Sequence, residues 1–511
     1  MNRARHLLQS SIIVIVLYGI NQLFGLVRTQ LVSNVFGTSL DYDAFTAANQ
    51  LPEVFVTLIS GGALAAAFIP VYTAYLENDK QRQSAKLANT VITLVLLILS
   101  SVSAVGAIFA PWITSALLVP GFSPEMQLLT ANLMRIILVQ TTIFGASGVL
   151  SSILNSHQHF TLPALAPMML NAGYLIGLFL FAPSLGIHGL AWGTVVGGLL
   201  HVLIQVPGLM RYRIRLRPSL DFRLGGVREI IWLMGPRVIT LGTVQIADLF
   251  IIRITSNLGA GATSGYFYGY YLQQLPETLF GTAIAIVLFP TMAEYFNRGD
   301  LAGLKRVASA GLRIIWTLTV PAAAALVLLG RPAIVVLLER GAFTPESTAL
   351  VYGILVFFSV RVVSESTLEI AARLFFAQHN TKTPMKVALL WLLINVAFAY
   401  LLVGPLGVGG LALASSIAFT IQVVILLYLN HRRLDGLPVR ELGLSFGRTA
   451  LATGGMALVI LTIGRFVSAP LPFLLVGGGA GLLTYLTLNV LLGGQELRDL
   501  VRLIRRRETA V

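Results

Sequence analysis

Long apolar runs alternate with short polar segments from one end of the chain to the other. Each run is about 20 residues long, which is the length an α-helix needs to cross a hydrocarbon core about 30 Å thick. We count fourteen such runs along the sequence. The pattern therefore predicts an all-α polytopic membrane protein with fourteen transmembrane helices.

The connections between these runs alternate in charge. Basic residues gather in the even-numbered connections: Lys80, Arg82, Lys86, Arg211, Arg213, Arg215, Arg217, Arg223, Arg228, Arg298, Lys305, Arg306, Lys382, Lys386, Arg432, Arg433 and Arg440. The odd-numbered connections contain few of them, and both ends of the chain are basic. Because cytoplasmic loops carry the excess of Lys and Arg, we expect both termini in the cytoplasm.

The composition agrees with this class. The 511 residues are 56% hydrophobic and 11% charged, whereas about 25% of an ordinary soluble protein is charged. The net charge of +14 follows the topology of the loops, so a nucleic-acid partner is not expected. The chain has no cysteine, which excludes disulfides, thiolate metal sites and cysteine nucleophiles.

Polar residues interrupt the first two apolar runs. Asn21, Gly25 and Arg28 have the spacing i, i+4, i+7, which places them on one helical face. A guanidinium near the middle of a bilayer costs roughly 2.5–3.5 kcal/mol, so it normally faces protein or water. We therefore expect this face to line a hydrated central cavity, and we expect Arg28 to bind substrate there together with Asn21, Gln22 and Asn49.

An internal repeat organises the chain. The segment QLPE at 50–53 returns at 274–277, FSPE at 122–125 returns as FTPE at 343–346, and LGIHGLA at 185–191 returns as LGVGGLA at 406–412. Several matches that recur in the same order and at nearly the same offset indicate duplication. Each copy holds six runs, so the two lobes share one orientation in the membrane, as in transporters with parallel repeats.

This repeat predicts the domain organisation. The expected parts are an N-terminal lobe at 1–210, a basic cytoplasmic linker at 211–228, a C-terminal lobe at 229–431, two appended helices at 432–493 and a basic tail at 494–511. The tail places apolar residues on one helical stripe among arginines. We expect it to lie along the inner membrane surface, and a solvated tail is the alternative.

Other polar features allow two interpretations each. Arg361, Glu365, Glu369 and Arg373 are four residues apart, so they can form a self-neutralising ladder or a proton relay or latch. Glu53 and Glu277 follow prolines at equivalent positions of the repeat. There the proline can kink a helix, so these segments act either as hinges or as gates.

Several motifs, in order, resemble the MurJ (MviN) lipid II flippase family. They are Gly25-Leu26-Val27-Arg28, Phe36-Gly37, Asp43-Ala44-Phe45, Ala67-Phe68-Ile69-Pro70, Ile153-Leu154-Asn155, Leu374-Phe375-Phe376-Ala377 and Asn380-Thr381-Lys382-Thr383-Pro384. The resemblance covers nearly the whole chain. It implies the fold of the multidrug/oligosaccharidyl-lipid/polysaccharide exporter superfamily and the translocation of undecaprenyl-diphosphate-linked disaccharide-pentapeptide across the bacterial cytoplasmic membrane.

The resemblance also implies roles for particular residues. Arg28 matches a cavity arginine that would bind the diphosphate, and Asp43 matches an acidic residue at the outer mouth. Asp248 and Asn395 can contribute oxygens to a sodium ion, as side chains of the second lobe do in some relatives. Asn395 matches that pattern, but Ala399, one turn on, supplies no oxygen. Coupling to Na⁺, to H⁺ or to the membrane potential therefore stays open. No cofactor and no metal cluster are expected, and we expect a monomer in the lipid bilayer.

The chain departs from the family where further cavity arginines are expected. Those positions hold Gln22, Val56 and Tyr271. Either Arg253, Arg237 or Arg135 takes their place, or the substrate has a different headgroup. The alternatives are therefore a flippase for another polyprenyl-diphosphate-linked oligosaccharide, an exporter of a small cation and a scaffold that does not transport.

An enzyme is the alternative that differs in kind. The acidic turn Asp41-Tyr42-Asp43 is similar to the acidic motif of membrane glycosyltransferases. Every outer loop is short, however, whereas those enzymes use a large outer domain. We therefore expect a transporter rather than an enzyme.

Overall fold

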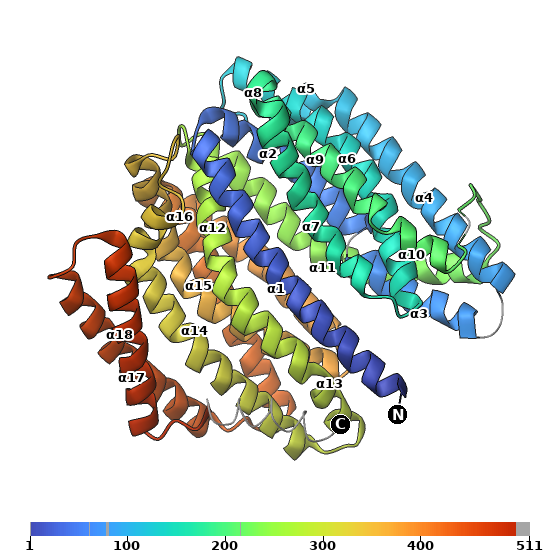
Figure 1. Cartoon of the computed structure of the whole chain (residues 1–511). Helices are drawn as coiled ribbons and strands as arrows, with labels where there is room; N and C mark the ends of the chain where they lie inside the picture. The colour runs from blue at the N-terminus through green and yellow to red at the C-terminus, as the bar shows by residue number, and fades with distance from the viewer. Residues whose placement is uncertain (1, 61, 78–80, 215, 497–511) are drawn as a thin grey trace. The chain divides into compact units, whose positions relative to one another are not determined.

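The computed structural model describes residues 2–60, 62–77, 81–214 and 216–496. Within these ranges every regular element is helical, and the helices are joined by short connections (Figure 1). This confirms the predicted all-α class. The predicted surface helix of the tail lies outside the described residues from residue 497 onward.

The chain divides into two compact units, residues 1–264 and 265–511. The core of unit 1 lies where α3, α4 and α6 pack, around Phe68, Leu99 and Ile153. The helices of this unit are α1 (Asn2–Phe36), α2 (Leu40–Phe55), η1 (Val56–Ser60), α3 (Gly62–Glu77), α4 (Gln81–Ile108), α5 (Ala110–Trp112), η2 (Ile113–Leu118), α6 (Pro124–Ser156), α7 (Thr161–Ile176), η3 (Gly177–Phe181), α8 (Ala182–Leu185), α9 (Ile187–Leu203), α10 (Val206–Arg211) and α11 (Gly225–Thr255).

Unit 2 has its own core between α13, α14 and α15, around Met292, Leu312 and Ile370. The helix α12 begins just before the boundary between the units. The helices of this part are α12 (Ala262–Pro276), η4 (Glu277–Thr282), α13 (Ala283–Asn297), α14 (Leu301–Leu337), α15 (Pro345–Ala377), α16 (Lys382–Arg433), α17 (Val439–Gly464) and α18 (Pro470–Leu491). The last two pack on each other and on α14.

Unit 1 includes α11, whereas the repeat begins its second copy at residue 229. The compact units and the sequence copies are different divisions of the chain. The predicted boundaries at 210, 228, 431 and 493 stay predictions.

Eleven of the described helices are long and apolar enough to cross a membrane. The number rises to twelve if the two segments of α11, which are bent by 42° between Ile239 and Leu241, form one span. The longest helix, α16, runs for 52 residues through Gly407, whose φ of 56° and ψ of −137° are not helical. A helix of this length would extend for about 78 Å, more than twice the hydrocarbon thickness. The polytopic fold is confirmed, and the count of fourteen stays a prediction.

The repeat extends to the backbone. The π-helical segment η1 begins at Val56, and its counterpart η4 begins at Glu277. Gly186 and Gly407, separated by the same offset along the chain, share a positive φ of 56°, and their ψ values are −135° and −137°. Since only glycine adopts this conformation readily, the duplicated LG motif keeps its glycine for a conformational reason.

The basic linker is bound to α4 within unit 1. Lys86 lies 2.5 Å from Asp221, and the backbone N–H groups of Arg217 and Ser219 donate to Asn89 and Thr93. The hydrogen bond from Lys86 holds the pKa of Asp221 below its usual value. Residues 217–221 of the linker therefore lie along α4.

Small residues let α7 and η3 approach α9 closely. A Cβ added at Gly173 would lie 2.2 Å from the Cα of Gly197, and one added at Gly177 would lie 2.6 Å from the Cα of Gly193. Helices in membranes associate through such small-residue contacts, because lipid supplies no hydrophobic driving force between them.

We predict that Gly173→Ala destabilises the protein by roughly 1–3 kcal/mol, because the added methyl group meets backbone that cannot move aside. Gly454→Ala is the matched control, since its Cβ would meet no atom within 4 Å, and alanine is the better helix former. The apparent melting temperature of each variant in detergent should fall for Gly173→Ala and should stay level or rise for Gly454→Ala. Equal melting temperatures would contradict the close packing.

Candidate functional site

Arg28 of α1 lies against α7 in unit 1. Its guanidinium carbon is 4.8 Å from the centroid of the Tyr174 ring, which is the geometry of a cation–π interaction. About two turns earlier on α1, the Oδ1 of Asn21 accepts a hydrogen bond of 3.1 Å from the Nδ2 of Asn171. Asn21 and Arg28, the two polar side chains of the predicted face, thus both contact α7.

A carboxylate completes this site. Glu53 of α2 attracts Arg28, and both act electrostatically on Tyr174. The Nδ2 of Asn49 lies 3.5 Å from Glu53, and Glu53 itself is exposed. The structure therefore brings together four of the residues singled out in the sequence: Asn21, Arg28, Asn49 and Glu53.

Arg28 has hydrogen-bonding capacity to spare. Within the described part of the chain, the N–H groups of its guanidinium make no hydrogen bond, although the residue is half-buried. An Arg side chain has five N–H donors in one plane, and the cation–π contact with Tyr174 does not require a hydrogen-bond acceptor. The site can therefore bind an anion such as a phosphate without first breaking a bond.

The other candidate arginines differ in this respect. Arg253 of α11 donates to the carbonyl groups of Ala116 and Leu117 at the end of η2, at 2.6 and 3.1 Å. Arg135 donates to the carbonyl of Ala107 and to the side chain of Asn132. These bonds close helix ends or link neighbouring helices. Arg237 is exposed on α11.

Asp43, expected at the outer mouth, is fully buried. Its two carboxylate oxygens accept hydrogen bonds from the backbone N–H groups of Gly261 and Ser264, at 2.6 and 2.7 Å. These are the free donors at the beginning of α12, where a negative charge also meets the positive end of the helix dipole. In this structure Asp43 joins α2 to the first turn of α12, and its role as a mouth residue stays a prediction.

Glu277, the counterpart of Glu53 in the repeat, lies in a different environment. It is 2% exposed and is the first residue of η4. Its carboxylate accepts hydrogen bonds from Gln274, Thr278 and Thr282, at 3.2, 3.4 and 3.1 Å. One copy of the QLPE motif thus ends in an exposed carboxylate and the other in a buried one.

The predicted ladder on α15 forms as two separate pairs. Arg361 binds Glu365 through its Nε and Nη2, at 2.9 and 3.2 Å, and Arg373 binds Glu369. Arg361 also donates to Ser415 of α16 and stacks on Tyr270 and Phe419. The i, i+4 pairing is confirmed, and a further role in ion coupling stays a prediction.

The remaining candidates are Gln22, Asp248 and Asn395, which belong to three different helices. Gln22 is half-buried on α1, Asp248 belongs to unit 1 and Asn395 belongs to unit 2. Asn395 is 4% exposed, and its Oδ1 has no hydrogen-bond partner. In the described part of the chain, no group of three or more His, Asp or Glu side chains is placed to hold a metal ion.

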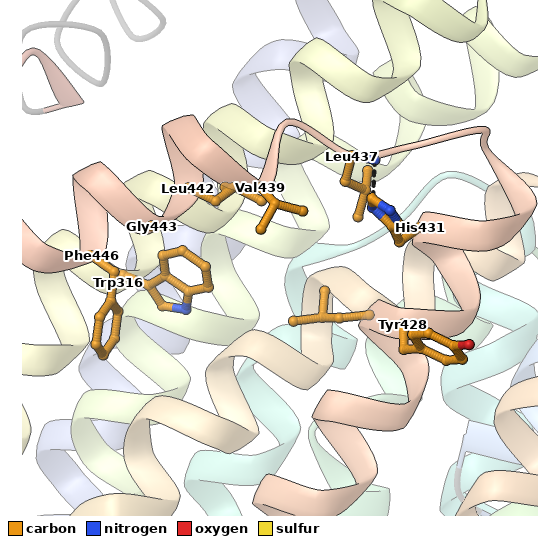
Figure 2. A pocket seen from close by; sticks show the side chains of 9 residues that line it. Trp316, Tyr428, His431, Leu437, Val439, Leu442, Gly443 and Phe446 are labelled. Carbon is orange, nitrogen blue, oxygen red and sulfur yellow. Dashed lines mark hydrogen bonds between the residues drawn. The ribbon is translucent and has the colours of Figure 1, made fainter.

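A cavity of about 530 Å³ lies in unit 2 between α14, α16 and α17. Figure 2 shows Trp316 and Phe446 on one side of it and Tyr428 and His431 on the other. The Nδ1 of His431 accepts the backbone N–H of Leu437 at 2.9 Å, so it is not available to a ligand. This apolar cavity suits a hydrocarbon chain and lacks the donors that a diphosphate needs.

Sequence reasoning missed three partners in these sites. Tyr174 and Asn171 are three residues apart on α7, so they share one face, and this spacing was the available signal. Gln273 of α12 donates to Glu365 across 92 residues. Nothing in the sequence marks that contact.

The chain is similar to known transporters over most of its length. The family model described as "Lipid II flippase MurJ" matches residues 32–476. A "Probable lipid II flippase MurJ" of Buchnera aphidicola is 29% identical over 432 residues, which are 83% of each chain. One from Vibrio cholerae is 28% identical and covers 97% of this chain and 98% of its own length.

Solved structures agree with the sequence matches. "Lipid II flippase MurJ, inward closed conformation" superposes with a TM-score of 0.82 at 25% identity, over 96% of this chain and all of that one. An inward-facing "multidrug resistance MATE family transporter of the MOP superfamily" gives a TM-score of 0.73 at 14% identity over 83% of this chain, which concerns the fold alone. The predicted family is confirmed by the family model and by these relatives. The chain belongs to the MurJ family of lipid II flippases, which are membrane transporters and not enzymes.

Proposed function

We propose that this chain translocates lipid II, the lipid-linked precursor of peptidoglycan, from the inner to the outer leaflet of the bacterial cytoplasmic membrane. Membership of the family supports this function. The observation that carries the mechanism is the half-buried guanidinium of Arg28, which stacks on Tyr174 with its N–H groups unpaired among the described residues. It is the group that binds the diphosphate of the substrate.

The proposed topology has fourteen spans with both termini in the cytoplasm. The eleven candidate helices become fourteen when α16 is divided at Gly407, the bent α11 is counted once and α1 is added. The alternation of basic loops supports the orientation. The backbone features that recur in both copies of the repeat support two six-helix lobes, and alternating access of these lobes is the proposed transport cycle. We propose that the protein acts as a monomer.

The proposed energy source is a monovalent cation or the membrane potential. Buried carboxylates in spans are costly unless they take part in function or are paired. Glu277 is buried, and the half-buried Glu365 and Glu369 lie on the neighbouring α15, so these three are the proposed coupling groups. Asp248 and Asn395 are the proposed ligands if the ion is Na⁺. The unpartnered Oδ1 of Asn395 supports its inclusion.

A second candidate is a flippase for another polyprenyl-diphosphate-linked oligosaccharide. The observation that favours it is the replacement of expected arginines by Gln22, Val56 and Tyr271. Proteoliposomes that contain labelled lipid II or a competing lipid-linked oligosaccharide separate the two functions. Translocation of lipid II supports the first, and translocation of the competitor alone supports the second. If the protein transports neither lipid, it acts as a scaffold. Rescue of cells depleted of their own lipid II flippase would contradict the scaffold.

We predict that Arg28→Ala abolishes translocation of lipid II in proteoliposomes, because no other donor replaces the guanidinium beside Tyr174. Arg298→Ala is the control, since Arg298 is exposed and pairs with Glu294 at the surface. Both variants should elute and melt like the unmodified protein. Normal transport by Arg28→Ala would refute the role of this residue.

We predict that Asp43→Asn lowers stability by roughly 1.5–3 kcal/mol, because an amide cannot accept both N–H groups at the beginning of α12. Asp41→Asn is the matched control in the same turn, since Asp41 is exposed. Apparent melting temperatures measure both. If Asp43→Asn melts like the control while it blocks transport, Asp43 serves the transport cycle and not the fold.

A further inference from the structure

The charges that act on Glu277 do not balance. Arg361 pairs with Glu365, and Arg373 pairs with Glu369. Glu277 forms no such pair among the described residues, yet it interacts electrostatically with Glu365, Arg361 and Arg373. With every group ionised, two cations face three carboxylates and leave one negative charge. At 2% exposure inside a candidate span, an uncompensated carboxylate is costly.

Arg361 cannot be shared with Glu277. Its Nε and Nη2 bind Glu365, and its Nη1 binds Ser415 at 2.9 Å. Its face lies 4.3 Å from the centroid of Phe419. These contacts fix the guanidinium between α15 and α16, so the surplus charge stays on Glu277.

The other elements that pack on η4 supply no further cation. On α14, Arg313 lies one turn from Thr317, whose carbonyl accepts a hydrogen bond from Tyr485 of α18. Arg313 is therefore on the face of α14 that meets α18. Its Nε is buried without a hydrogen-bond partner, but Arg313 is not among the charges that act on Glu277. On α13, Glu294 is exposed and pairs with Arg298. The face of α12 brings the polar but uncharged Tyr266, Tyr270, Gln273 and Gln274.

Two buried amide oxygens near Glu277 lack a donor. Glu277 already accepts three hydrogen bonds, from Gln274, Thr278 and Thr282. The amide oxygens of Gln273 and Gln274 and the hydroxyl of Ser366 are buried without a partner. Gln273 and Ser366 are completely buried, and the amide of Gln273 faces Glu365 at 3.2 Å. One proton would supply the missing donor.

The space suits a proton better than a larger cation. Gly281 of η4 packs so closely on α15 that an added Cβ would lie 2.5 Å from the Oγ of Ser366. A sodium ion would also have to displace the donors that fill the carboxylates of Glu277 and Glu365. Single π-helical turns within helices occur often at functional sites, and η4 begins at Glu277.

We propose that η4, α12 and α15 form a proton-binding site in which Glu277 takes up one exchangeable proton. The proton passes from hydronium to a carboxylate oxygen and leaves a neutral carboxyl group and water. A turn of the Gln274 amide then presents its oxygen to the new O–H group, in place of the N–H that the carboxylate accepted. Binding of the proton does not depend on the proposed function, whereas its use to drive transport rests on it.

Infrared difference spectra of the full chain in lipid nanodiscs, recorded between two pH values, test the site directly. The unmodified protein should show a protonated-carboxyl band that Glu277→Gln removes and that the exposed-site control Glu294→Gln retains. Glu277→Gln should fold, since glutamine is neutral and of similar shape, and chromatography with thermal melting checks this. Gln274→Leu is the second variant, and it should shift the band because it removes the acceptor.

Three results would overturn the proton site. They are a band that persists in Glu277→Gln, a band that only Glu365→Gln removes, and a spectral change that follows Na⁺ at constant pH. A band that Gln274→Leu leaves in place would remove Gln274 from the site.

Translocation of lipid II in proteoliposomes with and without a pH gradient tests the coupling. The gradient should change the rate of the unmodified protein, and the rates of Glu277→Gln should be equal under both conditions. If the variant lacks the band but still responds to the gradient, the proton at Glu277 does not drive transport. If the unmodified protein moves no lipid II at all, the proposed function fails while the infrared result still decides the proton site.

Discussion

The cost of an unpaired charge in hydrocarbon is the constraint on which the polar part of this structure depends. Within the spans, several charged side chains are stabilised by partners that lie close to them in space. Asp43 uses the backbone donors at the beginning of α12, Arg253 uses the carbonyl groups at the end of η2, and Arg361 uses Glu365. Such groups are structural in this conformation. Arg28 in unit 1 and Glu277 in unit 2 have no such pairing among the described residues, and the proposed functions therefore rest on them.

Duplication supplied a common backbone, and later substitutions gave each copy its own chemistry. The turn at Gly186 returns at Gly407, and the π-helical segment at Val56 returns at Glu277, both at one common offset. The carboxylates that follow the paired prolines have opposite exposure, however. Glu53 is exposed in the field of Arg28, whereas Glu277 lies beneath α15. The carboxylate of the same motif thus lies beside the proposed anion site in one copy and in a charge cluster in the other.

The sequence was most informative where the signal is local. Apolar run length predicted the all-helical membrane fold, and a spacing of four predicted the pairs of Arg361 with Glu365 and of Glu369 with Arg373. The spacing of Asn21 and Arg28 predicted their common face. Periodicity needs only neighbours along one helix, so these features follow from the order of residues alone.

Contacts between distant segments could not be read in the same way. The partners of Asp43 lie 218 and 221 residues away, and Tyr174 reaches Arg28 from another helix. The family resemblance of the sequence implies that Asp43 lies at an outer mouth. Its burial depends on which backbone donors the fold brings to it, and no local pattern records that. The number of spans is also ambiguous locally, because α16 continues through Gly407 without a polar break.

The way in which Arg28 is held bears on how an anion could bind and leave. A guanidinium fixed by hydrogen bonds, as in Arg253, would have to give up bonds worth roughly 0.5–1.5 kcal/mol each, and more where the arginine is charged, before it could bind phosphate. Stacking on Tyr174 positions the plane of Arg28 for a smaller gain of roughly 0.5–2 kcal/mol and leaves the donors at its edge unused. Glu53 attracts the same cation, so the arginine stays partly neutralised when no anion is near. Binding then becomes an exchange of one negative partner for another, which is weaker than capture by an isolated cation and therefore suits a site that must also release its substrate.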